Sequence, residues 1–515
     1  MVLTRPCLLI PSVDVLTTAP MWRRSRPFWG ACNQRPGAAA GTPEEAGARR
    51  WLLARGGSVK CLYGLVVGEE RAGGRPGRDL DAGRLLALLA GLPALTSISW
   101  MILRGDLHRR PTRAAIRAFL AEAARAIAGC SSLQTLRLRI SLLGGLAGQL
   151  PKALVCELAS MRSLEAVTLS FEACEADRPD WPATFSLAHL VAGLARLPRL
   201  RELSLMAENV GMEATLPASV SRLAQLTSLS LRWFDGLRCE PGWAHLPALV
   251  SLKFEDCVFA GDGEAALPGM DALGALTSLE LERCLGPRLL PASLWRLPQL
   301  RRLSHESGSH MDLVGVPRGE LPAAGPPVGG APCFASLTHL TLAGHHFEVF
   351  PPGVLAAVRL AHLDLSLCCF EQLPEGVSAL SALTELRLGR HAAGEWEVGG
   401  RLDARALGSL ARFPELRSLS FLNCSVLFDQ SFQAAAAHPR LAQLQLGTSY
   451  PALGPSCMAF LGFVYDLLQR GRAGLLTVCW CNVEGAGRRD SRRFRAALDA
   501  VGFSLYEDAL SDANE

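Results

Sequence analysis

The sequence predicts an α/β fold: a curved, horseshoe-shaped solenoid with a concave parallel β-sheet and a convex side of mixed helical and extended segments. Three observations predict it. A nine-residue apolar pattern recurs along most of the 515 residues, its spacing suits short strands, and helical or proline-containing segments separate the copies. A periodic chain of this length is expected to stack one unit on the next instead of forming separate globular domains.

The recurring pattern is clearest in Leu276–Cys284, which reads LTSLELERC. Apolar residues occupy positions 1, 4 and 6, and a small polar or thiol residue occupies position 9. Successive copies begin 23 to 38 residues apart, with a weaker copy at Leu475 and a degenerate one near Val59. The first leucines of the well-formed copies are Leu95, Leu133, Leu164, Leu200, Leu226, Leu249, Leu276, Leu300, Leu337, Leu360, Leu383, Leu416 and Leu441.

The spacing within the pattern has a physical cause. Side chains alternate across a β-strand, so the residues at positions 4 and 6 point to the same face and can both enter a core. One copy alone cannot bury its leucines, but stacked copies form a continuous core beside a parallel sheet. The residues between the leucines are therefore expected to project from the opposite, concave face.

The segments between copies are of two kinds. Thr112–Ala128 is an alanine-rich amphipathic stretch that predicts a helix, and Ser186–Arg196 and Asp403–Arg412 are similar. Other segments open with Leu-Pro, at Leu216, Leu290 and Leu373. Because proline fixes φ and lacks an N–H donor, these segments predict turns on the convex side and not paired strands.

On these residues the chain resembles the leucine-rich-repeat superfamily. The short L-P-x-x-[LV]-x-x-L copies are similar to intracellular Ras-group and plant-type repeats, and the long helical copies are similar to ribonuclease-inhibitor-type repeats. The resemblance covers roughly residues 55 to 485. It implies a curved solenoid that recognises protein partners.

Three regions are expected. Residues 1–50 form a disordered or targeting N-terminal arm, residues 51–485 form the solenoid of about 13–15 repeats, and residues 486–515 form a C-terminal cap and tail. Arg488–Val501 predicts an amphipathic capping helix, because a repeat stack must cover its terminal leucines. The segment Met311–Pro332, rich in Pro, Gly and Ala, predicts a surface loop.

The composition limits the classes of partner and the cellular locations that are expected. The formal net charge of +4 and the lack of a dense basic run predict no nucleic-acid partner. No apolar stretch is long enough to span a bilayer, and no secretory signal opens the chain, so no membrane insertion is expected. The 16 scattered cysteines favour a reducing cytoplasmic location. The chain is also expected to be a monomer. A transit segment to an organelle and a place in the cytoskeleton or ciliary axoneme are the alternatives.

Cysteines are expected to be structural. Cys257, Cys284, Cys368 and Cys424 fall at position 9. The family resemblance implies that this position is a ladder of buried side chains that satisfy backbone groups where the chain leaves the strand. Cys479-Trp480-Cys481 alone supplies too few ligands for zinc, so no metal is predicted.

No motif for catalysis or cofactor binding is present. His305 and His310 lie five residues apart, whereas the zinc-protease motif needs ligands four apart on one helix face. There is no phosphate-binding loop, nucleophile elbow or kinase signature. The sequence therefore predicts no enzymatic activity and no cofactor.

A partner is expected on the concave strip, where positions 3, 5, 7 and 8 of each copy project. An acidic centre beside a tryptophan is the most distinctive part, because Trp and Arg commonly anchor interfaces and acidic rows favour basic partners. His339, His362, Glu385 and Arg390 are expected on the same side. The predicted partner-binding residues are Arg232, Trp233, Lys253, Glu255, Asp256, Glu280, Glu282, Arg283, Glu306, Asp364 and Arg387.

The expected function is therefore a non-enzymatic scaffold that binds a protein on its concave face. Two alternatives remain at this point. Trp51–Gly57 resembles the junction after an F-box in repeat-bearing ubiquitin-ligase adaptors, which would make the chain a substrate-recognition adaptor. The third possibility is a structural component of a cytoskeletal or ciliary assembly.

Overall fold

The fold was analysed in a computed structural model, whose contacts divide the chain into two compact units. Unit 1 comprises Met1–Gly261 and Ala265–Ala275, and unit 2 comprises Asp262–Glu264 and Leu276–Glu515. Each unit is described by itself. The structure describes residues 60–63, 66–68, 89, 92–104, 113–142, 157–173, 184–208, 213–261, 265–285, 292–307, 334–343, 352–366, 368, 377–389, 401–402, 413–422, 425–426, 438–448, 469 and 476–481.

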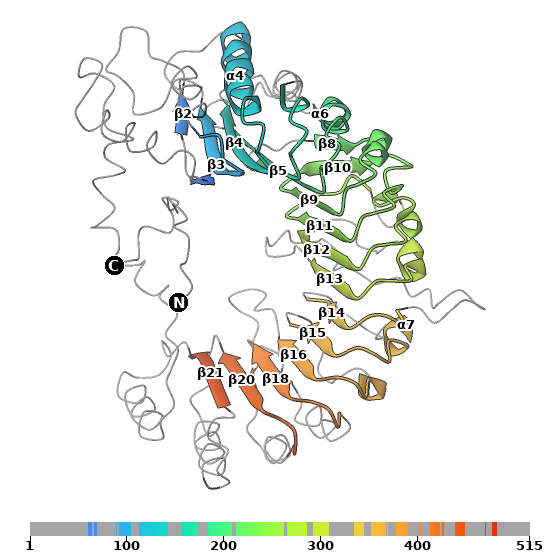
Figure 1. Cartoon of the computed structure of the whole chain (residues 1–515). Helices are drawn as coiled ribbons and strands as arrows, with labels where there is room; N and C mark the ends of the chain where they lie inside the picture. The colour runs from blue at the N-terminus through green and yellow to red at the C-terminus, as the bar shows by residue number, and fades with distance from the viewer. Residues whose placement is uncertain are drawn as a thin grey trace. The chain divides into compact units, whose positions relative to one another are not determined.

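Unit 1 contains a parallel ladder in which each strand pairs with the strand of the next repeat (Figure 1). The short strand β2 (Val66–Gly68) joins it by pairing with the second half of β3. In ladder order the other strands are β1 (Cys61–Tyr63), β3 (Ser97–Arg104), β4 (Thr135–Leu142), β5 (Ala166–Ala173), β7 (Glu202–Glu208), β9 (Ser228–Arg232) and β11 (Ser251–Glu255).

Unit 2 contains a ladder of the same kind, again parallel throughout. Its strands in order are β12 (Ser278–Cys284), β13 (Arg302–Ser307), β14 (His339–Thr341), β15 (His362–Leu365), β16 (Glu385–Gly389), β18 (Ser418–Leu422), β20 (Gln443–Thr448) and β21 (Leu476–Cys481).

The nine-residue pattern sets where each strand begins. In all thirteen well-formed copies the strand starts at position 3, two residues after the first leucine. Those first leucines are at most 2% exposed. Within β12 the burial alternates as the pattern predicts, with Leu279 and Leu281 fully buried and the residues between them partly exposed. Burying one leucine side chain contributes about 1.5–3 kcal/mol, so the stacked rows are the main source of stability.

Position 2 adds a link between neighbouring repeats. The hydroxyl of Thr227 donates to the carbonyl oxygen of Arg201 in the preceding repeat at 3.0 Å, and Thr384 donates in the same way to Ala361 at 3.0 Å. The backbone N–H groups of positions 2 and 3 also donate to that carbonyl. This carbonyl at the entry of each strand is therefore satisfied without water.

The return segments lie along one side of each ladder (Figure 1). Helices α4 (Arg113–Ala128) and α6 (Leu187–Leu194) confirm two of the predicted helices. The Leu-Pro segments form short 3-10 helices, as at Ala218–Arg222, which follows Pro217 at φ −77°. The remaining short helical pieces are α7 (Pro352–Leu355) and the 3-10 helices Met270–Ala272, Ala292–Arg296 and Val377–Ala379.

A second, smaller parallel sheet in unit 1 differs from the expected turns. It joins β6 (Thr184–Ser186), β8 (Glu213–Leu216) and β10 (Asp235–Cys239). Strand β8 ends at Leu216, directly before Pro217, so the proline still stops the pairing. In unit 2, β17 (Arg401–Leu402) pairs with β19 (Ser425–Val426).

Several expectations lie outside the described residues. They are the N-terminal arm, the helix at Asp403–Arg412, the loop at Met311–Pro332, the cap helix Arg488–Val501, and the position-9 residue Cys424. Among the residues that the structure describes, no helix is long and apolar enough to cross a lipid bilayer.

Candidate functional site

The predicted partner-binding residues fall in both units. Arg232, Trp233, Lys253, Glu255 and Asp256 belong to unit 1. The other six, Glu280, Glu282, Arg283, Glu306, Asp364 and Arg387, belong to unit 2. Each group is described within its own unit.

In unit 1 two of the predicted residues, Arg232 and Lys253, both bind a third, Glu255. Glu255 is only 5% exposed, and its Oε2 atom lies 3.1 Å from Nζ of Lys253 and in contact with the Arg232 guanidinium. Burial alone would raise the pKa of Glu255, but the hydrogen bonds and charges of Arg232 and Lys253 outweigh it and lower the pKa to about 2. Glu255 was expected to project toward a partner, and instead it holds two neighbouring strands together.

Trp233 and Asp256 occupy position 8, where the chain leaves the strand. Trp233, Asp256 and Arg283 have φ values of 60°, 52° and 50°. This left-handed conformation turns the chain so that the position-9 side chain enters the core, as Phe234 and Cys257 do at 0% exposure. The Trp233 ring is partly exposed, and the Arg232 guanidinium carbon lies 5.4 Å from its centre.

In unit 2 the side chains of five neighbouring strands, mostly those at positions 3 and 5, line a hollow of about 300 Å³. We call it the unit 2 groove. Its volume lies at the lower end of the range of about 300–1,000 Å³ for small-molecule sites, and its lining is mainly polar. The lining residues are Glu280, Glu282, Arg302, Ser304, His339, Leu340, Thr341, His362, Leu363, Asp364, Glu385 and Arg387.

The register of the ladder arranges these residues in two rows. Position 3 contributes the row Arg302, His339, His362 and Glu385. Position 5 contributes the second row, in which adjacent residues are register partners: Glu280, Ser304, Thr341, Asp364 and Arg387. Each row crosses the strands at about 4.8 Å per step, the usual spacing of a sheet.

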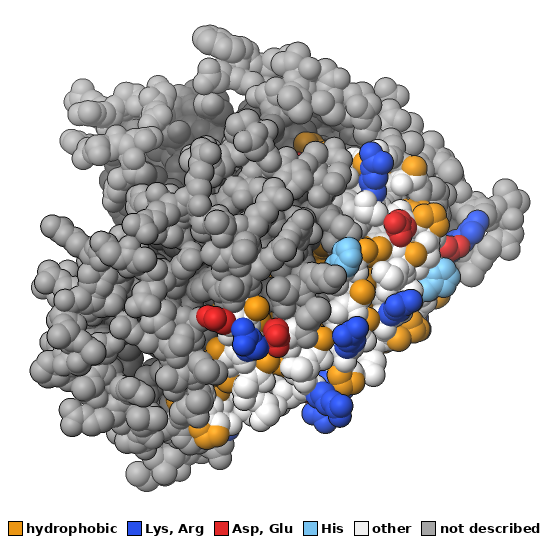
Figure 2. Space-filling view, turned by 90° about the horizontal axis from the view of Figure 1, so that it is seen from above, with side chains coloured by type: hydrophobic (Ala, Val, Ile, Leu, Met, Phe, Trp, Pro, Cys, Tyr) orange, Lys and Arg blue, Asp and Glu red, His pale blue; other side chains and the backbone are white. Residues whose placement is uncertain are grey.

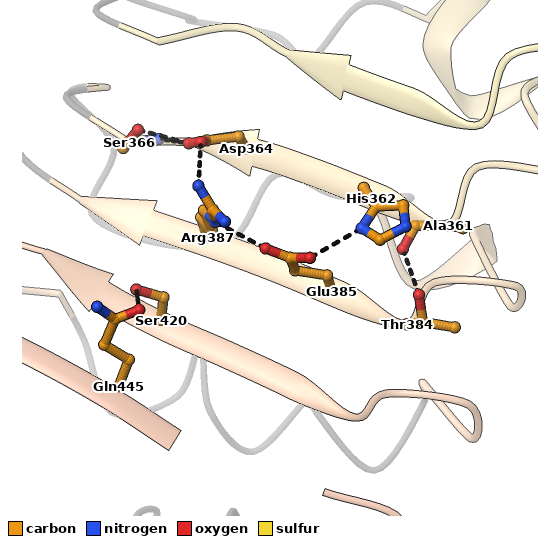
Figure 3. A network of polar contacts seen from close by, with 9 residues as sticks. All are labelled: Ala361, His362, Asp364, Ser366, Thr384, Glu385, Arg387, Ser420 and Gln445. Carbon is orange, nitrogen blue, oxygen red and sulfur yellow. Dashed lines mark hydrogen bonds and ion pairs between the residues drawn. The ribbon is translucent and has the colours of Figure 1, made fainter. Parts of the chain in front are cut away.

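A polar network fixes one end of the groove (Figure 3). Arg387 Nε donates to Oε1 of Glu385 at 2.7 Å, and its guanidinium lies 3.8 Å from Oδ2 of Asp364. The other carboxylate oxygen of Glu385 lies 2.8 Å from Nδ1 of His362. The backbone N–H of Ser366 donates to Oδ1 of Asp364 at 2.9 Å. These contacts fix the side-chain directions before any ligand arrives.

The imidazole rings of His339 and His362 stack in the middle of the groove, with centres 4.1 Å apart and planes inclined by 8°. Burial lowers the pKa of His339, and the neighbouring His362 and Arg302 lower it further against a weaker opposing effect of Glu385. Glu385 has a lowered pKa because His362 and Arg387 outweigh its own burial. At neutral pH His339 is therefore uncharged and Glu385 is ionised.

The groove contains some residues that were selected from the sequence and some that were not. Glu280, Glu282, Asp364 and Arg387 line it, whereas Arg283 and Glu306 are not among its lining residues. Ser304, Thr341 and Arg302 were missed. Counting positions 3 and 5 in every copy would have found them, because the register of the ladder follows the pattern without a shift at these positions.

Exposed apolar surface is scarce. Among the described residues, the large hydrophobic side chains that are exposed are Val250 at 41% and Val358 at 64%. Figure 2 shows one face, where hydrophobic side chains are scattered between charged, histidine and other polar groups. Recognition on the described surface would therefore depend mainly on polar and charged contacts.

The position-9 cysteines that the structure describes are structural. The thiol of Cys368 is 1% exposed and donates to the carbonyl oxygen of Leu342 at 2.8 Å. Cys257 is fully buried, and its thiol lies 3.4 Å from the carbonyl oxygen of Leu231. Within the described part of the chain, no group of His, Cys, Asp or Glu side chains could hold a metal ion.

Comparison with known proteins gives matches only among solved structures, since no protein-family model and no curated protein matches the chain. An internalin from Listeria monocytogenes is 12% identical, with 77% of this chain and 82% of that chain covered at a TM-score of 0.38. A leucine-rich-repeat protein of Leptospira interrogans is 13% identical, with 82% and 97% covered and a TM-score of 0.35. TLR13, solved in a complex with ssRNA13, is 14% identical, with 83% of this chain and 62% of that chain covered at a TM-score of 0.39.

The class of the protein follows from its own repeats. Parallel strands set by a leucine frame, a buried position-9 ladder, and return segments of 3-10 or α-helix together define a leucine-rich-repeat solenoid.

Proposed function

We propose that this chain is a non-enzymatic interaction scaffold that binds a protein partner on the strand face of unit 2. The observation that carries the proposal is the groove across β12 to β16. At one end of it the side chains of His362, Glu385 and Arg387 are held in fixed directions by hydrogen bonds to one another. A site whose side chains are already ordered loses less conformational entropy on binding than a mobile one.

The position of the groove supports a macromolecular partner. The groove extends over five successive repeats and is lined by two rows of side chains. Five strands at about 4.8 Å spacing give a row of roughly 20 Å, which suits a peptide segment better than a compact small molecule. The partner is expected to make hydrogen bonds and ion pairs, because the lining is mainly polar.

Blocking the groove is expected to remove the partner. Thr341 lies at the centre of the position-5 row, so Thr341→Trp would fill the groove without changing its charge. Affinity purification from native extract with the full tagged chain should recover a stoichiometric partner, and Thr341→Trp should reduce its affinity at least about tenfold, equivalent to about 1.4 kcal/mol.

The matched control is Val358→Trp. Val358 is 64% exposed and lies on a return segment of the same unit. It should retain the partner, and both variants should keep the circular dichroism spectrum and melting temperature of the wild type. Retention of the partner by Thr341→Trp at wild-type affinity would contradict the proposed site.

A further inference from the structure

We propose that the unit 2 groove binds an extended, basic segment of the partner, with two Lys or Arg side chains four residues apart, one at each end of the groove. This inference rests on the proposed function and names the chemistry of the partner. The groove selects the charge and the spacing of the side chains on the bound segment, and the fold alone determines neither.

The charge of the groove differs from that of the whole chain. Its lining contains four carboxylates and two guanidinium groups, whereas the whole chain has a formal net charge of +4. A basic ligand would be repelled weakly by the chain as a whole and attracted locally here. Attraction confined to one groove therefore confers specificity, since charges more than about 10 Å away are screened at moderate salt.

The negative charge is divided between the two ends. Glu280 and Glu282 project from the same face of β12, and Arg302 on the adjacent strand lies opposite Ser278, two residues before Glu280. At the other end, Asp364 and Glu385 lie on β15 and β16 beside Arg387. Among the lining side chains, each end thus has two carboxylates and one guanidinium, so carboxylates outnumber guanidinium groups at both ends. Each end suits one cationic side chain.

The centre of the groove suits a peptide backbone. Ser304 and Thr341 have short hydroxyl side chains, which leave space between the two acidic ends. Hydroxyl and imidazole groups can both donate and accept hydrogen bonds, so Ser304, Thr341 and His339 can pair with peptide N–H and C=O groups. An extended segment crossing the strands would therefore meet polar partners along its length.

The distance between the ends sets the spacing of the two cations. Glu280 and Asp364 are three strands apart in the register, which corresponds to about 14 Å at 4.8 Å per strand. An extended segment advances about 3.4 Å per residue, so four residues span the same distance. Residues four apart in an extended segment also project to the same side. Both conditions are met at a spacing of four, whereas at three the side chains point to opposite sides.

Two fluorescent dodecapeptides of Gly and Ser test the inference on the full chain. One carries arginine at positions 4 and 8 and the other at positions 4 and 7, so their charge is the same. Fluorescence anisotropy at low salt should show the first peptide binding at least about fivefold more tightly than the second. Equal binding of the two peptides, or binding of neither, would overturn the inference.

The double variant Glu280→Gln/Glu282→Gln should weaken the binding of the first peptide at least about tenfold. The matched control Glu165→Gln/Glu202→Gln removes the same charge from the partly exposed Glu165 and the exposed Glu202 in unit 1 and should leave binding unchanged. An equal loss in both double variants would mean that overall charge drives binding, which overturns the inference. If Thr341→Trp still removes the native partner while the two peptides bind alike, the site on the strand face stands and the basic segment does not.

Discussion

Replacing Leu279 by aspartate is expected to lower the free energy of unfolding by at least about 4 kcal/mol. Leu279 is fully buried at position 4 of its repeat, and its neighbour across the ladder, Leu303, is also buried. Truncating such a leucine typically costs about 2–5 kcal/mol, and an unpaired carboxylate in an apolar core adds its own desolvation cost. Urea titration and thermal melting followed by circular dichroism measure the loss.

The control places the same residue on the surface of the same unit. Val358 is 64% exposed on a return segment, so Val358→Asp should change the free energy of unfolding by less than about 0.5 kcal/mol. A Leu279→Asp variant that melts together with wild type would show that the leucine frame is wrong at this repeat. Because repeat arrays can unfold in stages, the midpoints of the first transition should be compared.

Stability is expected to fall in acid through Glu255. Its pKa is lowered from 4.5 to about 2 in the folded chain, so the ion pairs with Arg232 and Lys253 stabilise the folded state above the unfolded pKa. That contribution is lost as the pH falls from about 4.5 through about 2. A difference of this size corresponds to roughly 3 kcal/mol, at about 1.36 kcal/mol per pKa unit.

Glu255→Gln removes this titration and tests the assignment. The variant should be less stable than wild type at pH 7 by up to about 3 kcal/mol, and the difference should shrink as the pH approaches 2. Glu202→Gln, at an exposed position in the same unit, should follow wild type at every pH. A constant difference between Glu255→Gln and wild type over this range would mean that Glu255 does not carry a lowered pKa.

The strands of the ladder could be predicted from the sequence because each strand depends on the residues of a single repeat. Positions 4 and 6 must share one face of a strand, which places a strand over this part of the pattern. In the structure the strand of each of the thirteen well-formed copies starts two residues after the first leucine. The α4 helix was predicted for the same kind of reason, since Ala123, Ala124 and Ile127 form a buried stripe at helical spacing.

The second sheet in unit 1 could not be predicted in this way. Strands β6, β8 and β10 have three to five residues and lack a repeated alternation of their own. They pair because the main ladder holds successive return segments side by side. The sequence of one return segment alone does not indicate this pairing. Strand propensity depends strongly on such context.

The candidate site was predicted in part. The frame correctly places Glu280, Asp364 and Arg387 on the strand face, but it assigns the same role to every residue at positions 3, 5, 7 and 8. Whether a side chain is available to a partner depends on its neighbours in the adjacent repeats. Glu255 is buried beneath Arg232 and Lys253, whereas the small side chains of Ser304 and Thr341 leave a hollow between larger neighbours.

Site-specific photo-crosslinking tests the central claim most directly. A photoreactive amino acid at Thr341, in the middle of the unit 2 groove, and the same amino acid at Val358, on a return segment, report which face the partner occupies. The account predicts a covalent adduct with one partner protein from position 341 in native extract and none from position 358. Adducts from position 358 alone, or equally from both positions, would contradict recognition on the strand face.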